Sequence, residues 1–97
     1  MSTYITLCKF TEQGIKDVKN APKRVLATQK AMEKMGGKMT GFYLTMGEYD
    51  YVAIGEAPND EVACTFILGL GAAGNLKTTT MKAFTLEEYT KIVKNLP

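Results

Sequence analysis

Two strand-like runs, residues 38–46 and 49–56, are separated only by Gly47 and Glu48, and this short connection constrains the fold more than any other feature. A glycine at the first of two turn residues suits a type II′ turn, so the two runs should be antiparallel neighbours. A helical pattern and a further strand pattern flank this hairpin on each side. The order predicts an α+β fold, a ferredoxin-like βαββαβ arrangement with an antiparallel sheet and a C-terminal helix.

Caps and glycines mark where the helices begin and end. Thr11 begins a short helical stretch that stops before Pro22, and Pro22 opens a longer helix that Gly36-Gly37 ends. Residues 60–73 form a helix that is apolar almost all round, and Thr85-Leu86-Glu87-Glu88 is a capping box that begins the last helix. The two remaining strand patterns are residues 3–10 and 76–84.

The composition is that of one ordinary folded domain, residues 1–97, and it narrows the possible chemistry. Hydrophobic residues make up 45% of the chain and charged residues 23%, as in a typical globular domain. Histidine is absent, which removes Ser-His-Asp and Cys-His nucleophilic sites and most transition-metal sites. We therefore expect no metal and no cofactor. The net charge of +2 is too balanced to indicate direct nucleic-acid binding or attachment to a membrane surface.

Cysteine usage and hydropathy bear on the compartment. No apolar run is long enough to span a membrane, and the chain opens on a strand pattern rather than on a signal segment. The two cysteines, Cys8 and Cys64, form no C-x-x-C pair and are expected to be small buried apolar residues. These features predict a reduced, cytoplasmic protein.

Alternation along the strands divides the sheet side chains into two sets, and both are rich in apolar residues. We expect the helices to cover the set Ile5, Leu7, Phe42, Leu44, Val52 and Ile54. The opposite, open set then holds Tyr4, Thr6, Cys8, Phe10, Met39, Tyr43, Thr45, Tyr49, Tyr51 and Ala53. An open face this apolar needs a partner, and a second copy packed sheet against sheet is the simplest one. The alternative is that the last helix folds back over this face.

Candidate ligand-binding residues lie on and beside the open set. Asp50 follows the hairpin turn and is predicted to point inward, where a carboxylate needs hydrogen bonds or a cation. Arg24, the only arginine, can bind a carboxylate with two N–H groups. The structural alternative is that Asp50 fixes the turn through backbone N–H groups and that the tyrosine rings only pack an interface. The predicted pocket residues are Tyr43, Tyr49, Asp50, Tyr51, Arg24, Thr78 and Thr80, of which the threonines supply hydroxyl groups.

Residues 69–74 match the pattern G-x-G-x-x-G, but in the wrong context. The dinucleotide-binding fingerprint needs a strand before it and a helix after it, so that the phosphates meet the helix N-terminus. Here a helix precedes the glycines and a strand follows them. Close packing and a helix C-cap therefore explain these glycines better than a nucleotide does.

Over nearly its whole length the chain resembles the GYD family. The matching segments are Tyr4-Ile5-Thr6-Leu7, Phe10-Thr11-Glu12-Gln13-Gly14-Ile15, Pro22-Lys23-Arg24, Gly36-Gly37-Lys38, Phe42-Tyr43-Leu44-Thr45, Gly47-Glu48-Tyr49-Asp50, Glu56-Ala57-Pro58, Gly71-Ala72-Ala73-Gly74-Asn75 and Ala83-Phe84-Thr85. The Gly-Tyr-Asp core carries Glu48 between its glycine and its tyrosine. The resemblance implies a dimeric α+β barrel of ferredoxin-like subunits with no settled biochemical activity.

A weaker likeness covers the second half of the chain. The segments Gly47-Glu48-Tyr49-Asp50-Tyr51 and Thr78-x-Thr80 look like the effector-binding domain of Lrp/AsnC transcription regulators, in which small effectors sit at subunit interfaces. No helix-turn-helix module precedes these segments here, so we expect no direct contact with DNA.

Three functions remain open on the sequence. The first is a non-enzymatic, homo-oligomeric module that binds a small molecule or regulates, with a pocket near the sheet and the subunit interface. The second is a cofactor-independent monooxygenase or isomerase acting on an aromatic or polyketide-like substrate, with a tyrosine or Asp50 as proton acceptor. The third is a purely structural oligomer without a ligand.

Overall fold

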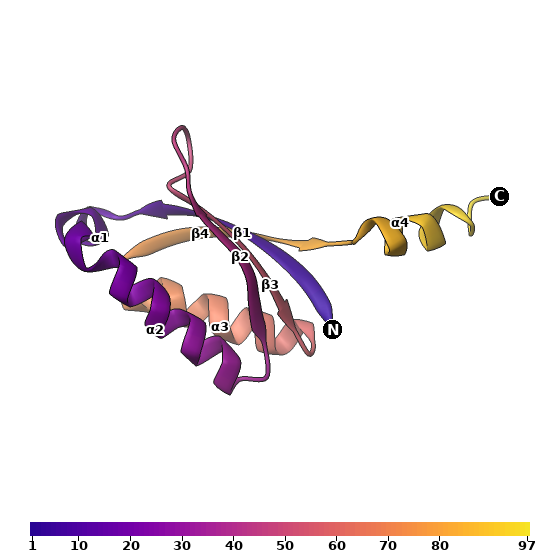
Figure 1. Cartoon of the computed structure of the whole chain (residues 1–97), viewed down its shortest axis with the longest axis horizontal. Coiled ribbons are helices and arrows are strands. Elements are labelled where there is room, and N and C mark those ends of the chain that lie inside the picture. The colour runs from indigo at the N-terminus through magenta and orange to yellow at the C-terminus, as the bar shows by residue number, and fades with distance from the viewer.

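The computed structural model describes all residues, 1–97, and confirms the predicted α+β class. Its elements are β1 (Ser2–Phe10), α1 (Glu12–Lys16), the 3-10 turn η1 (Val18–Asn20), α2 (Ala21–Lys34), β2 (Lys38–Leu44), β3 (Tyr51–Ala57), α3 (Asp60–Ala73), β4 (Leu76–Ala83) and α4 (Leu86–Val93). The four strands form one antiparallel sheet in the order β2-β3-β1-β4. Helices α2 and α3 cover one face of this sheet and leave the other face open (Figure 1).

The helix caps explain why the helices begin where they do. The Thr11 hydroxyl accepts a hydrogen bond from the backbone N–H of Gly14 in α1, and the Asn59 side chain accepts one from the backbone N–H of Val62 in α3. Thr85 and Glu88 form the predicted capping box of α4. Gly74 ends α3 in the left-handed region, at φ 85°, which glycine adopts without steric cost. Helix α3 therefore precedes the last glycine of residues 69–74 and β4 follows it, as predicted. Nothing lies within 4 Å of a Cβ atom at Gly69 or Gly71, so the expectation of close packing is wrong for these two glycines.

The short helix α1 is fastened to the turn between α3 and β4. The Thr11 backbone N–H donates to the carbonyl oxygen of Asn75 at 3.1 Å, and the Thr11 hydroxyl donates to that of Gly74 at 2.6 Å. The Gln13 amide adds a hydrogen bond to the carbonyl oxygen of Ala73 at 3.1 Å. These bonds join two segments that are about sixty residues apart in the sequence, and they close one end of the space between the helices and the sheet.

The hairpin between β2 and β3 is longer than predicted. Strand β2 ends at Leu44 and β3 begins at Tyr51, so a loop of residues 45–50 replaces the two-residue turn. The Thr45 hydroxyl donates to the carbonyl oxygen of Tyr49 at 2.6 Å, and the Thr45 backbone N–H donates to that of Asp50 at 2.8 Å. These bonds close the loop at its base and take the place of further pairing between the strands. The tip projects from the sheet as a narrow loop (Figure 1).

The predicted assignment of side chains to the two sheet faces is wrong for β1 and β3. Thr6 lies opposite Ala53 on one side and Thr80 on the other, and all three line the space beneath the helices. Ile5 lies opposite Ile54 and Met81, so these residues lie on the open face. In an antiparallel pair, directly opposite residues share a face.

Within β2 the predicted faces of Phe42, Leu44 and Tyr43 are confirmed. Phe42 lies opposite Ala53 and Leu44 opposite Tyr51, on the helix-covered face, and Tyr43 lies opposite Val52 on the open face. Met39 is predicted on the open face but lines the cavity, so its assignment is wrong. The pairing shifts by one residue between Met39 and Gly41, and this bulge changes the alternation along the strand. The open face is thus formed mainly by Ile5, Leu7, Tyr43, Val52, Ile54, Thr79 and Met81.

The chain has a thin core. Only 7 of the 97 residues are buried, and no large side chain is fully buried. Cys8 belongs to this core as predicted, whereas Cys64 on α3 is exposed, so the expectation of burial is wrong for the second cysteine. No helix has the length and hydropathy that crossing a membrane requires.

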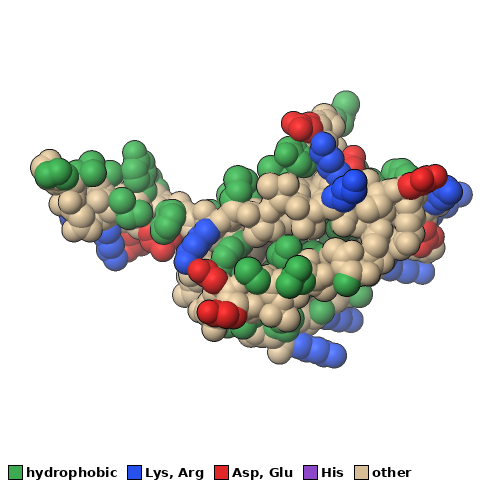
Figure 2. All heavy atoms as spheres, turned by 180° about the vertical axis from the view of Figure 1, so that it is seen from behind, with side chains coloured by type: hydrophobic (Ala, Val, Ile, Leu, Met, Phe, Trp, Pro, Cys, Tyr) green, Lys and Arg blue, Asp and Glu red, His purple; other side chains and the backbone are tan.

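The C-terminus extends away from this core. Helix α4 lies beyond the end of β4, away from the sheet (Figure 1), so the alternative in which it folds back over the open face is wrong. Its hydrophobic side chains gather on one side and its charged ones on the other (Figure 2).

Candidate functional site

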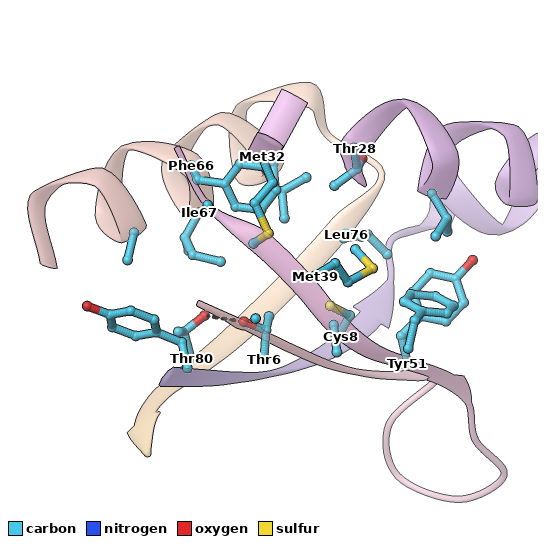
Figure 3. A pocket seen from close by; sticks show the side chains of 18 of the residues that line it. Thr6, Cys8, Thr28, Met32, Met39, Tyr51, Phe66, Ile67, Leu76 and Thr80 are labelled. Carbon is cyan, nitrogen blue, oxygen red and sulfur yellow. Dashed lines mark hydrogen bonds between the residues drawn. The ribbon is translucent and has the colours of Figure 1, made fainter. Parts of the chain in front are cut away.

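A cavity of about 310 Å³ lies between the sheet and the helices α2 and α3 (Figure 3). The four strands form its floor, and α2 and α3 form its roof. Of the 29 residues that line it, 21 are hydrophobic. The helices supply its roof chiefly through Val25, Thr28, Met32, Phe66, Ile67 and Leu70. A space of this size and composition is typical of a small-molecule site.

Two threonine hydroxyls meet at the centre of the cavity floor. Thr6 of β1 and Thr80 of β4 are directly paired across the two strands, and their Oγ1 atoms lie 3.0 Å apart in a hydrogen bond (Figure 3). Cys8, one step further along β1, faces the same space, and burial raises the pKa of its thiol to about 11. This thiol therefore stays protonated at neutral pH and contributes a polarisable, uncharged wall.

Three aromatic rings close one end of the cavity. The ring of Tyr51 contacts Phe10 edge-on, with centroids 5.0 Å apart, and contacts Phe42 with centroids 4.8 Å apart. These distances are favourable for aromatic pairs. Burial raises the pKa of Tyr51 and the charge of Arg24 opposes this rise, so the phenol is neutral at physiological pH.

Arg24 stands beside this aromatic end with its charge already engaged. Its guanidinium donates to the carboxylate of Asp17 at 2.9 Å, to the carbonyl oxygen of Asp17 at 3.0 Å and to that of Gly14 at 3.3 Å. Its side chain is 28% exposed. Arg24 therefore ties α2 to α1 across the end of the cavity.

The other end of the cavity adjoins a charged cluster. The Tyr4 hydroxyl donates to the carboxylate of Asp60 at 2.5 Å, and the ammonium of Lys82 lies 3.1 Å from the same oxygen. The hydrogen bond from Tyr4 and the one from Lys82 lower the pKa of Asp60, and Asp60 in turn raises the pKa of both partners. Asp60 is the first residue of α3, so the cluster fixes the start of this helix over β1 and β4.

Three of the seven predicted pocket residues line the cavity: Arg24, Tyr51 and Thr80. They come from α2, β3 and β4, and the fold alone brings them around one space. The cavity lies on the helix-covered side of the sheet, whereas the alternation in β3 predicts Tyr51 on the open side.

The other four predicted residues lie elsewhere. Tyr43 is on the open face and 62% exposed, and Tyr49 is in the hairpin loop with Lys9 over its ring at 5.2 Å. The carboxylate of Asp50 accepts a hydrogen bond from the backbone N–H of Phe10 at 2.8 Å, so it binds a structural N–H group, but one at the end of β1 rather than in the turn. Thr78 lies opposite Cys8 on the helix-covered side but does not line the cavity.

Thr6, which pairs with Thr80, and the residues at the charged end of the cavity are not predicted from the sequence. Alternation groups Thr6 with Cys8 and Phe10 but predicts all three on the open face, and nothing near Thr6 in the sequence shows that its partner is Thr80. The cluster of Tyr4, Asp60 and Lys82 joins three distant segments, and only the sheet order reveals it. The one available signal is the hydrophobicity of α3, of which Phe66 and Ile67 line the cavity whereas Leu68 on the outer side is exposed.

Comparisons with known proteins agree with this architecture. A family model described as the GYD domain matches residues 4–93. A curated protein of Thermus thermophilus, named "Glutamine synthetase and cystathionine beta-lyase binding protein", is 29% identical over 84 residues, which cover 86% of this chain and 88% of that protein.

Two solved structures share the fold. The structure of FFRP-DM1 matches with a TM-score of 0.61 and 21% identity, over 87% of this chain and 100% of the other. The structure of TTHA0845 from Thermus thermophilus matches with a TM-score of 0.56 and 22% identity, over 88% of this chain and 95% of the other. At these identities the likeness shows a common architecture.

Proposed function

Because the chain belongs to the GYD domain family, and because its two layers enclose a cavity, we propose that it is a homo-oligomeric regulatory module that binds a small molecule between its sheet and its helices. The observation that carries this proposal is the cavity of about 310 Å³ with a mostly hydrophobic wall. Leaving such a space empty forfeits the contacts of its lining, so an occupant would stabilise the fold.

The ionisation of the lining favours binding over proton abstraction. Tyr4 and Tyr51 both line the cavity, and both have a raised pKa, Tyr4 because it donates to Asp60 and Tyr51 because it is buried. A tyrosine that accepts a proton at neutral pH would need a lowered pKa instead. The Cys8 thiol is likewise held in its protonated form. These groups suit the recognition of a neutral ligand.

The open face of the sheet supports self-association. Isoleucine, leucine, valine, tyrosine and methionine side chains cover its middle, and its charged residues, such as Lys9 and Glu56, stand only toward the strand ends. A sheet face in water carries charged and polar residues along its whole length instead. A second copy with its own open face would bury both surfaces around a two-fold axis. In such a dimer each subunit keeps its own cavity on the outer, helix-covered side.

Blocking the cavity tests the binding function. Ala53 faces the cavity from the middle of β3, and replacing it with leucine places three further carbon atoms inside. In native mass spectrometry of protein purified gently from its own host, we expect the wild-type chain to retain a small molecule and Ala53→Leu to lose it. Ala72→Leu, on the exposed side of α3, is the matched control and should retain it. Equal retention by both variants, or bare protein throughout, would contradict the proposal.

A second function, as a protein-binding adaptor, is favoured by the relative named for binding glutamine synthetase and cystathionine beta-lyase. In this chain α4 offers a surface for it, since its apolar side chains are exposed and lie away from the body of the subunit. Such an amphipathic helix can lay its apolar side into a groove of a partner.

A direct binding measurement tests the adaptor. Immobilised glutamine synthetase of the same host should bind the wild-type chain, and Ile92→Glu in the apolar side of α4 should weaken binding by roughly tenfold or more, because it buries an unpaired carboxylate. Lys91→Glu, on the charged side, is the control and should change binding little. Binding that is insensitive to Ile92→Glu would exclude α4 as the contact.

A further inference from the structure

We propose that the ligand of the cavity is an uncharged, mostly hydrocarbon aromatic molecule of about two fused rings that carries one neutral oxygen, and that the hydroxyl pair of Thr6 and Thr80 recognises this oxygen. This inference rests on the proposed binding function and adds the chemical class of the ligand.

The volume sets the size of the ligand. A protein cavity of roughly 150 Å³ lined by aliphatic and aromatic side chains holds one benzene molecule. The cavity here, at about 310 Å³, is close to twice as large. It therefore accommodates a two-ring molecule, or a chain of similar volume.

The charge distribution excludes a charged ligand. Arg24 and Glu56 are the only charged residues that line the cavity. The guanidinium of Arg24 is engaged by Asp17 and Gly14, and Glu56 lies opposite Thr3 and Lys38 in the sheet, in the row that faces the open side. A carboxylate or ammonium placed among the remaining walls would lose its hydration without gaining a partner.

The wall favours a flat aromatic molecule over a flexible chain. Phe10, Phe42 and Tyr51 are grouped at one end and Phe66 comes from the roof, so ring faces and edges are available on two sides. Sulfur atoms complete the wall, from Cys8, Met32, Met35 and Met39. Thioethers beside aromatic rings are favourable and adapt to the ligand's outline.

The hydroxyl pair supplies the one specific polar contact. Thr6 and Thr80 hold two hydroxyl protons, and their mutual hydrogen bond at 3.0 Å uses one of them. Neither hydroxyl makes another hydrogen bond in the structure, so the second proton is free to point into the cavity. A carbonyl or phenol oxygen above the pair can accept it, and the oxygens of the pair keep lone pairs for a ligand hydroxyl.

Three matched compounds test the inference: 2-naphthol, naphthalene and 2-naphthoate, each titrated calorimetrically into the wild-type chain. We expect 2-naphthol to bind roughly five- to tenfold more tightly than naphthalene, the factor that one hydrogen bond in an apolar site supplies. The anion 2-naphthoate should bind more weakly than 2-naphthol, because it brings a charge among apolar walls. Tighter binding of the anion would overturn the assignment of a neutral ligand.

The double variant Thr6→Val/Thr80→Val assigns the preference to the hydroxyl pair. Both residues are replaced because either hydroxyl alone could still form a hydrogen bond to the ligand. Replacing both partners of a hydrogen bond with groups of the same shape also costs little stability. We expect the variant to bind 2-naphthol and naphthalene equally, while Thr79→Val, on the open face, keeps the wild-type ratio.

The outcomes separate this inference from the function on which it rests. Equal wild-type affinity for 2-naphthol and naphthalene, or a preference that survives in the double variant, overturns the role of the hydroxyl pair and leaves the cavity as a binding site. Failure of all three compounds to bind the wild-type chain, together with a retained host molecule that Ala53→Leu displaces, overturns the ligand class alone. If none of the three compounds binds and no host molecule is retained, the binding function itself is overturned.

Discussion

Gly14→Ala is expected to lower the free energy of unfolding by about 3 kcal/mol, the upper end of the usual cost of overpacking. Gly14 is buried, and a Cβ atom there would overlap the carbonyl oxygen of Asn75 and lie 2.9 Å from its carbonyl carbon. These are backbone atoms, so no side chain can rotate away. To make room, α1 has to move from the α3–β4 turn, which breaks the hydrogen bond from the Thr11 backbone N–H.

Thermal unfolding at a fixed protein concentration measures this effect. A loss of about 3 kcal/mol in a domain of this size lowers the melting temperature by more than about 10 °C. Gly69→Ala is the matched control, since nothing lies within 4 Å of a Cβ atom at this position in α3. Removing a glycine from a helix interior should stabilise the chain by about 0.5–1 kcal/mol. Unchanged stability of Gly14→Ala would show that α1 is not docked as described.

Leu7→Glu is expected to convert the proposed dimer into single subunits. Leu7 lies in the middle of the open face, opposite Val52 on β3 and Thr79 on β4. In a dimer built on this face, each copy would bury an unpaired carboxylate. Such burial costs several kcal/mol per copy, so association should weaken by at least about a thousandfold.

Sedimentation velocity at micromolar concentration distinguishes the two states. The wild-type chain should sediment with twice the subunit mass of 10.7 kDa, and Leu7→Glu with the mass of one subunit. Leu68→Glu provides the control, because Leu68 is also an exposed leucine, on the outer side of α3, away from the open face. A wild-type chain that sediments as one subunit, or a Leu7→Glu variant that stays a dimer, would exclude this interface.

The order of elements follows from local chemistry, and local chemistry can be read from a sequence. Thr11, Asn59 and Thr85 cap helices because a side-chain oxygen three residues before a free N–H is enough to form the bond. Gly74 ends α3 for an equally local reason. The fold class, the four strands and both main helices were predicted for this reason.

The choice of sheet face depends on contacts that local chemistry does not show. Alternation assigns residues to two sets, and both sets here are apolar, so the hydrophobic pattern does not tell which one the helices cover. The bulge between Met39 and Gly41 adds a change of alternation within β2. The loop of residues 45–50 ends the ladder early through bonds of Thr45 to Tyr49 and Asp50, which a two-residue turn would not make.

The candidate site was only partly predictable for a related reason. Its lining comes from six elements, and the hydrogen bond between Thr6 and Thr80 depends on β1 and β4 lying side by side in one register. Arg24 stands out in the sequence as the only arginine, but its partner is Asp17, seven residues away on the neighbouring turn. The residue types of Thr80 and Arg24 predict polar contacts, but only the fold determines which atoms they contact.

The sheet is one layer thick, and this has a thermodynamic consequence. Along β1, residues that line the cavity alternate with residues whose side chains lie on the open face. Each cavity residue of β1 is therefore covalently bonded to a neighbour on the opposite face. Any adjustment of strand twist that accompanies occupancy is transmitted to the opposite surface without an intervening layer. If filling the cavity changes the dimerisation constant by some factor, dimerisation must change the ligand's affinity by the same factor.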